Sequence, residues 1–127
     1  MVLGIGVDTI EINRFSLWNT YSVKKLQRIF SLHEIEYCLQ DRKKSAERFA
    51  VRFASREALY KALSYAYPNI TIPFLTLCAH TTIKKIGARP ILELSSECGI
   101  DSNKFVIHLS LTHSRTHATA FVVLESR

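Results

Sequence analysis

The chain opens with the stretch Val2-Leu3-Gly4-Ile5-Gly6-Val7-Asp8, from which the predicted fold and site both follow. This short apolar run contains two glycines and ends on a carboxylate, which is typical of a buried β-strand. Glycines inside a strand allow another backbone to approach closely, so we interpret Gly4 and Gly6 as packing positions. A nucleotide-binding loop is the weaker interpretation, because neither a third glycine nor a Gly-Lys-Ser/Thr sequence follows.

Asp8, at the predicted end of this strand, has two interpretations. A strand-terminal aspartate is often the N-cap of the following helix. It can also ligate a hard metal ion when a second carboxylate lies nearby. That second carboxylate is Glu57, which lies within the basic helical segment Arg52-Phe53-Ala54-Ser55-Arg56-Glu57-Ala58-Leu59-Tyr60-Lys61. Two carboxylates flanked by cations are suited to hold a metal ion against phosphate.

The remainder of the chain predicts one domain over residues 1–127 with an α+β fold. Apolar spacing predicts a basic first helix within residues 12–30. Ser31 and Glu34 form a capping-box pattern that predicts a short helix to about Cys38, and a long helix follows from about Ser45 to Tyr65. The second half predicts antiparallel strands, over residues 81–86, 90–94, 106–112 and 117–124. We expect an antiparallel sheet packed with a long central helix.

The composition is that of a globular protein, with 47% apolar and 22% charged residues. The net charge of +6 predicts an anionic partner, which could be nucleic acid, an acidic protein or a polyphosphate substrate. We expect no membrane span and no signal peptide, because the apolar runs are short and the first one stops at Asp8. Three scattered cysteines, Cys38, Cys78 and Cys98, favour reduced thiols in a cytoplasmic protein.

Positive charge is concentrated on the long helix. Arg48, Arg52 and Arg56 follow at four-residue steps, where like charges repel one another. An anionic ligand or partner that relieves this repulsion is the favoured interpretation, and a solvated basic face is the alternative. Glu57 and Lys61 have the spacing of an ordinary surface ion pair, which is the alternative to a functional role for them.

Three histidines, His108, His113 and His117, cluster around the final hairpin. A zinc site is conceivable, but neither fixed ligand spacing nor a cysteine partner supports it. His108 is interpreted as an ordinary strand residue. His113 follows a strand, where functional residues concentrate, and it could donate a hydrogen bond to a phosphate.

Three motifs in this chain resemble those of the holo-acyl-carrier-protein synthases, the small 4'-phosphopantetheinyl transferases. Residues 4–14 look like the opening of that family, and residues 52–63 resemble its central helix motif. Leu109-Ser110-Leu111-Thr112-His113-Ser114, followed by Ala118-Thr119-Ala120, resembles its C-terminal motif. The motifs occur in the family's order and the similarity extends over nearly the whole chain. Arg56 replaces the usual lysine, and Ser64-Tyr65-Ala66-Tyr67-Pro68 replaces a glycine-containing turn.

The resemblance implies that Asp8 and Glu57 ligate a magnesium ion, with Asp8, Glu57 and Lys61 as the catalytic set. It also implies that coenzyme A is bound by Lys61 and His113, to which we add Arg52 and Arg56. Arg14 would meet the acidic acyl carrier protein, and the basic first helix would steer that partner with Lys24, Lys25 and Arg28. A homotrimer with each active site at a subunit interface is implied as well, as is a role in fatty acid biosynthesis.

These expectations describe one reaction. A carrier-protein serine attacks the β-phosphorus of coenzyme A, takes the 4'-phosphopantetheine arm and releases 3',5'-ADP, while Lys61 and the arginines stabilise the phosphate oxygens. A water on the metal is favoured over Glu57 as the base, because a carboxylate bound to a cation is a weak base. The rival prediction, a nucleic-acid-binding module, explains the charge but not the carboxylates among the cations. The last strands also lack a cluster of stacking aromatics, so we expect no nucleic acid.

Overall fold

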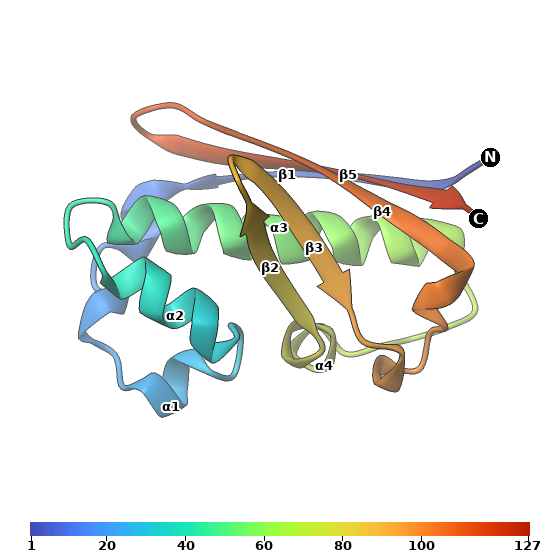
Figure 1. The fold of residues 1–127 in the computed structure, drawn as a ribbon, viewed down its shortest axis with the longest axis horizontal. Coiled ribbons are helices and arrows are strands. Elements are labelled where there is room, and N and C mark those ends of the chain that lie inside the picture. The colour runs from blue at the N-terminus through green and yellow to red at the C-terminus, as the bar shows by residue number, and fades with distance from the viewer.

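The computed structural model describes residues 1–127, and its largest unit is a three-stranded antiparallel sheet. The strands are β1 (Val2–Glu11), β4 (Phe105–His113) and β5 (His117–Ser126), in the order β1-β5-β4. Val2 pairs with Glu125, so the two ends of the chain lie side by side (Figure 1). The strands predicted at the start and end of the chain are confirmed, as is the pairing of the last two.

The helix α3 (Ser45–Ala66) crosses one face of this sheet along its length (Figure 1). Its bounds confirm the prediction to within one residue. A Cβ added at Gly4 or Gly6 would overlap the carbonyl oxygen of Ala62 or Ala58, so only glycine lets β1 lie this close to α3. This close approach confirms that both glycines are packing positions.

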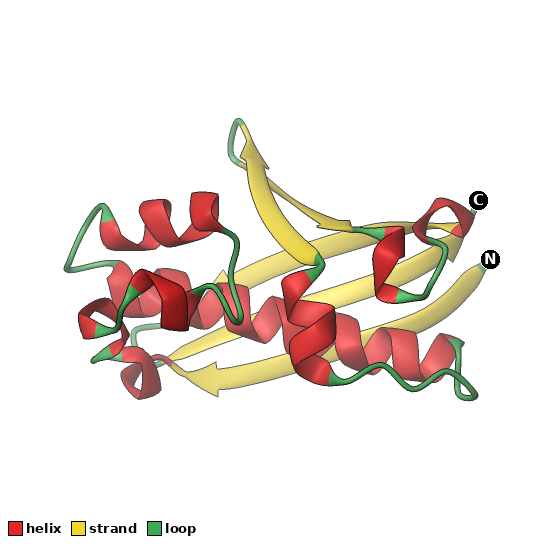
Figure 2. Ribbon diagram, turned by 90° about the horizontal axis from the view of Figure 1, so that it is seen from below, coloured by secondary structure: helices red, strands yellow, loops and turns green.

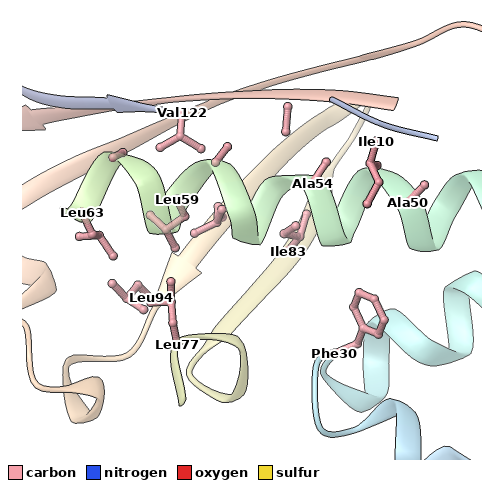
Figure 3. Close-up of a cluster of buried hydrophobic side chains, with 14 of the residues drawn as sticks. Ile10, Phe30, Ala50, Ala54, Leu59, Leu63, Leu77, Ile83, Leu94 and Val122 are labelled. Atoms are coloured by element: carbon pink, nitrogen blue, oxygen red, sulfur yellow. The ribbon is translucent and has the colours of Figure 1, made fainter. Parts of the chain in front are cut away.

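The hydrophobic core lies on both sides of α3. Above the helix, small and β-branched residues of the sheet such as Ala118, Ala120 and Val122 pack onto it, and Figure 3 shows Val122 and Ile10 on this side. Below the helix, Leu59 and Leu63 lie near Leu77 and Leu94, and Phe30 lies toward the other end of α3 (Figure 3).

The smaller elements all lie on the α3 side of the sheet (Figure 2). They include α2 (Leu32–Leu39), α4 (Phe74–Ala79) and a two-stranded sheet formed by β2 (Thr81–Ile86) and β3 (Arg89–Leu94). Two 3-10 turns, η3 (Ser96–Cys98) and η4 (Ser102–Lys104), lead into β4. Together these elements confirm the α+β fold class. None of the helices combines the length and apolar character needed to cross a membrane.

Local signals in the sequence explain where α2 begins and where the β2–β3 hairpin turns. The Ser31 hydroxyl accepts from the Glu34 amide while the Glu34 carboxylate accepts from the Ser31 amide, which confirms the capping box. Gly87 has a φ of 63° at the first position of the two-residue turn between β2 and β3, a conformation that favours glycine.

Two predictions in the first third of the chain are wrong. Asp8 neither ends its strand nor caps a helix, because the β-branched Thr9 and Ile10 extend β1 to Glu11 and Ile10 enters the core. The basic first helix is absent as a continuous helix. Residues 12–30 instead form the 3-10 turns η1 (Ile12–Phe15) and η2 (Trp18–Thr20) and a single turn, α1 (Val23–Leu26).

Aromatic packing and capping explain why that segment is broken. The centroid of the Trp18 ring lies 4.5 Å from that of Phe15, 6.0 Å from that of Phe30 and 6.2 Å from that of Phe49. This packing turns the chain inward. The Ser22 hydroxyl then accepts from the Lys25 amide and starts a new helix at Val23. Apolar spacing alone did not distinguish these short turns from one long helix.

The outer face of the three-stranded sheet has no helix over it (Figures 1 and 2). Apolar side chains lie on this outer face in cross-strand pairs, with Val7 opposite Phe121 and Ile5 opposite Val123. Ile5, Val7 and Phe121 are 53%, 51% and 42% exposed, which is unusual for large apolar residues in the middle of a sheet. The outer face is therefore a candidate surface for association.

Candidate active site

Two carboxylates predicted to act together do lie together. Asp8 points from β1 to the α3 side of the sheet, where Glu57 and Lys61 project from α3, and the Lys61 ammonium lies 3.2 Å from an Asp8 carboxylate oxygen. Lys61 also donates to the Val7 carbonyl at 3.0 Å. We call Asp8 and Glu57 the acidic pair. Their proximity follows from the close packing of β1 on α3.

The electrostatics of Glu57 show which charges surround it. Burial raises the pKa of Glu57 above the usual glutamate range, and the negative charge of Asp8 raises it further. The positive charges of Lys61 and Arg14 act in the opposite direction. Four of the predicted site residues, Asp8, Arg14, Glu57 and Lys61, are therefore close enough to influence one another.

The acidic pair fits a magnesium ion better than a transition metal. No group of three or more histidine, cysteine, aspartate or glutamate side chains converges anywhere in this structure, so a metal would receive few protein ligands. Magnesium commonly takes one or two carboxylates and completes its shell with waters and substrate phosphates. Burial and the negative charge of Asp8 both raise the pKa of Glu57, and a bound dication would offset both by favouring the charged carboxylate.

A second candidate locus is a cavity of about 420 Å³ bounded by α3, β4 and the β2–β3 hairpin. We call it the cationic pocket, after four of its lining residues, Lys44, Arg48, Arg52 and Lys85, and His113 lines it as well. The predicted residues Arg52 and His113 thus share one cavity. The His113 ring nitrogen Nε2 lies 3.1 Å from a carboxylate oxygen of Glu47, the acidic residue of the pocket.

The acidic pair and the cationic pocket lie on opposite sides of one molecule. Asp8 belongs to β1 at one edge of the sheet, whereas His113 belongs to β4 at the other edge. Around α3, Arg52 and Glu57 are five positions apart and so point about 140° away from each other. One copy of the chain does not bring all the predicted residues to one place.

Arg56 does not lie in either locus, and the prediction that it binds substrate is wrong for this molecule. Its side chain is fully buried, where it donates to both carboxylate oxygens of Glu34, at 3.0 and 2.6 Å, and to the Thr81 carbonyl at 2.8 Å. Burial alone would raise the pKa of Glu34, but the hydrogen bonds and charge of Arg56 outweigh it and hold that pKa below its usual range. Glu34 thus supplies to Arg56 the negative charge that this arginine was expected to find in a ligand.

The residues predicted to meet a partner lie along the broken first segment. Arg14 is in η1, Lys24 is in α1, and Arg28 follows α1. Arg28 and Lys25 flank a cavity of about 320 Å³ whose apolar walls include Trp18, Ile29 and Leu75. This basic and apolar surface approaches the acidic pair through Arg14, whose charge acts on Glu57.

The residues that replace the glycine-containing turn form the C-terminal end of α3 and the residues just beyond it. With no glycine to end it, α3 continues through Ser64 and Tyr65 to Ala66, and it stops before Pro68. Ser64 and Pro68 line a small cavity of about 150 Å³ with mostly apolar walls. These residues follow Lys61 along α3 and do not include the acidic pair.

Sequence reasoning missed several residues of the cationic pocket. Tyr37, Lys44, Glu47 and Lys85 come from three separate elements and belong to no continuous motif. Consecutive strand residues face opposite ways, so Lys84 and Lys85 point apart. Which of them faces α3 depends on how the hairpin packs, and that is a tertiary property.

Comparison with known proteins identifies the class to which this fold and site belong. The model of the 4'-phosphopantetheinyl transferase superfamily matches residues 4–122, and the chain belongs to that superfamily. Within it the chain falls among the holo-[acyl-carrier-protein] synthases. It is 37% identical over 128 residues to the synthase of Treponema denticola, covering 98% of this chain and 99% of that protein.

Solved structures give the same result. A holo-(acyl-carrier-protein) synthase from Bacillus anthracis, in complex with CoA (3',5'-ADP), is 30% identical with a TM-score of 0.78, covering 100% of this chain and 99% of that one. The synthase of Helicobacter pylori, in complex with coenzyme A, is 29% identical with a TM-score of 0.72, covering 95% of this chain and 99% of that one. The resemblance drawn from three short motifs is thereby confirmed over the full length.

Proposed function

We propose that this protein transfers the 4'-phosphopantetheine arm of coenzyme A to a serine of an apo acyl carrier protein, in a magnesium-dependent reaction that releases 3',5'-ADP. The observation that carries the proposal is the convergence of Asp8, Glu57, Lys61 and Arg14 beside the close contact of β1 with α3. Its relatives are named for this activity, and two of their structures contain coenzyme A.

The acidic pair would hold the magnesium ion, which when bound neutralises charge on the pyrophosphate. Lys61 is placed to exchange its contact with Asp8 for a phosphate oxygen. Its side chain is half-exposed, and an ion pair with an exposed member contributes little stability. As the serine oxygen forms a bond to the β-phosphorus, the bond from that phosphorus to the bridging oxygen of 3',5'-ADP breaks. The serine proton passes to solvent at the acidic pair, since carboxylates committed to a cation are weak bases.

The cationic pocket would bind the nucleotide end of coenzyme A through Arg52 and His113. Because the pocket and the acidic pair face away from each other within one copy, we infer that they meet across a boundary between copies. The outer face, with its exposed Ile5, Val7 and Phe121, supports association. In a cyclic homotrimer the outer face of every copy would be covered by the other copies. Each active site would then combine the acidic pair of one copy with the pocket of its neighbour.

The surface that carries Arg14, Lys24 and Arg28 would receive the acyl carrier protein. Its positive charge suits an acidic partner, and it ends at the acidic pair where the serine must arrive. Three free buried cysteines support a reducing compartment, so we place the reaction in the cytoplasm, in the service of fatty acid biosynthesis.

The mass of an apo carrier protein after incubation with coenzyme A and magnesium tests the proposal. The intact protein is expected to add a phosphopantetheine group, whereas Asp8→Asn and Glu57→Gln should each lose at least about a hundredfold in rate while remaining folded. Transfer at the normal rate by either variant would refute the acidic pair as the metal site. No transfer by the intact folded protein would refute the function.

A further inference from the structure

Three cations from two elements converge on one aromatic ring in the cationic pocket. Tyr37 lies on α2, and its ring centroid is 3.9 Å from the Arg48 guanidinium, 4.7 Å from that of Arg52 and 5.1 Å from the Lys85 ammonium. Arg48 and Arg52 come from α3, whereas Lys85 comes from β2. Tyr37 is therefore the residue that these cations share.

Hydrogen bonds fix two of the cations to Tyr37. The Lys85 ammonium donates to the Tyr37 hydroxyl at 3.0 Å, and the Arg48 guanidinium donates to the Tyr37 backbone carbonyl at 2.8 Å. The hydrogen bond from Lys85 lowers the pKa of Tyr37, against the effect of burial, and the charges of Lys85, Arg48 and Arg52 lower it further. The ring thus lies in a strongly positive field.

The positive charge around Tyr37 is not neutralised within the chain. The carboxylate of Glu47, the acidic residue of the cationic pocket, lies 3.1 Å from the His113 ring nitrogen Nε2 and forms no ion pair with Arg48, Arg52 or Lys85. A Glu34 carboxylate oxygen lies 3.7 Å from Arg52 Nε, but both Glu34 oxygens accept hydrogen bonds from the two terminal guanidinium nitrogens of Arg56. Lys85 and Arg48 therefore lack a carboxylate partner, and an anion entering the cavity would supply one.

We propose that Lys85 and Arg48 bind a phosphate of the nucleotide end of coenzyme A, and that Tyr37 is the positioning residue that holds both cations at the cavity. This inference rests on the proposed function and adds residues from α2 and β2 that no motif of the chain contains. A cation on an aromatic face and a lysine on a phenol hydroxyl are both preorganised, so less side-chain entropy is lost when the phosphate arrives.

Adjacent lysines on one strand provide a matched pair for the test. Lys84 and Lys85 are neighbours on β2, but Lys84 pairs with Glu93 at 3.3 Å outside the cavity. Lys84→Met and Lys85→Met remove the same charge from the same strand. We expect Lys85→Met to weaken binding of 3',5'-ADP, measured calorimetrically on the intact protein, by about tenfold, and Lys84→Met to change it less than twofold.

Tyr37 is tested by the hydroxyl and the ring separately. Tyr37→Phe keeps the stacked ring but frees Lys85, and Tyr37→Leu removes both contacts. We expect KM for coenzyme A to rise about threefold in Tyr37→Phe and further in Tyr37→Leu, with kcat nearly unchanged. A purely structural role would lower the midpoint of urea unfolding without this rise in KM.

Two outcomes would overturn the inference. Equal binding of 3',5'-ADP by the Lys84 and Lys85 variants would remove Lys85 from the site, and an unchanged KM in both Tyr37 variants would remove the positioning role. Either result can occur while the intact protein still transfers phosphopantetheine, so the proposed function would stand. Conversely, nucleotide binding that depends on Lys85 in a protein without transfer activity would support this site and refute the proposed function.

Discussion

Glu57 illustrates, at the scale of single residues, how the site costs the fold some stability. Because its folded pKa is raised, the folded chain holds this proton more tightly than the unfolded chain does. The stabilising contribution of Glu57 is complete below the unfolded pKa, near the usual glutamate value, and is lost as pH rises through the folded pKa. At neutral pH the acidic pair is thus a repulsive contact that a dication is suited to offset.

We therefore expect Glu57→Gln to stabilise the fold at pH 7 in the presence of a chelator. Its urea midpoint should exceed that of the unchanged protein, and the gap should narrow as pH falls into the range where Glu57 itself takes up a proton. Glu36→Gln, on the exposed side of α2, removes a carboxylate elsewhere and should give a small gap at all pH values. A Glu57→Gln variant that is less stable than the unchanged protein at pH 7 would contradict this interpretation.

Arg56 shows where reading single residues from sequence failed. Four-residue spacing correctly placed Arg48, Arg52 and Arg56 as neighbours along α3, and it correctly identified a need for negative charge. For Arg56 the source of that charge is Glu34, twenty-two positions away, and no local pattern links the two residues. By contrast, Asp8 and Glu57 were paired from their chemistry, as two carboxylates set among cations, and the resemblance to a family supported the pairing.

Packing between elements determines the geometry of the acidic pair, because β1 can approach α3 only through Gly4 and Gly6. We expect Gly6→Ala to cost about 3 kcal/mol, since its methyl group would overlap the Ala58 carbonyl oxygen. Gly87→Ala is the control, because open space surrounds Gly87 and only its positive φ opposes the change, at about 1 kcal/mol. Equal unfolding free energies for the two variants in urea would show that β1 is not tightly seated on α3.

The ion pair between Glu34 and Arg56 joins α2, α3 and β2 in the core. Removing one partner leaves a buried charge, so Arg56→Met should cost about 3–5 kcal/mol. The double variant Glu34→Leu/Arg56→Met removes both charges of the pair and should recover part of that loss in urea unfolding, because the buried Arg52 and the capping box lose Glu34 as well. If the double variant were less stable than Arg56→Met alone, the attraction within the pair would outweigh the cost of burying it, contrary to our account.

Elements with strong local signals were predicted well from sequence. The capping box fixed the start of α2, composition and Pro68 fixed α3, and alternating apolar residues gave β4 and β5. The segment over residues 12–30 was not predicted, because its structure depends on the packing of Trp18 against Phe15, Phe30 and Phe49. The cationic pocket was only half predicted for a similar reason, since α2 and the hairpin reach it from distant parts of the chain.

At the scale of the whole molecule, the acidic pair and the cationic pocket lie on opposite sides of one copy. The acidic pair lies at the β1 edge of the sheet and the cationic pocket at the β4 edge, and the outer face between them carries exposed apolar side chains. Association through such faces brings unlike edges of neighbouring copies together in a ring. The central claim is that one active site takes its acidic pair from one copy and its cationic pocket from the next.

Complementation between two inactive variants tests that claim most directly. One variant is Glu57→Gln, which removes one carboxylate of the acidic pair. The other combines Arg48→Met with His113→Ala and so disables the cationic pocket. Each is refolded alone and in an equal mixture, and transfer to an apo carrier protein is measured. We predict that the mixture regains on the order of a quarter of the normal activity, as expected for random assembly of a ring. A mixture no more active than either variant alone would contradict the shared site.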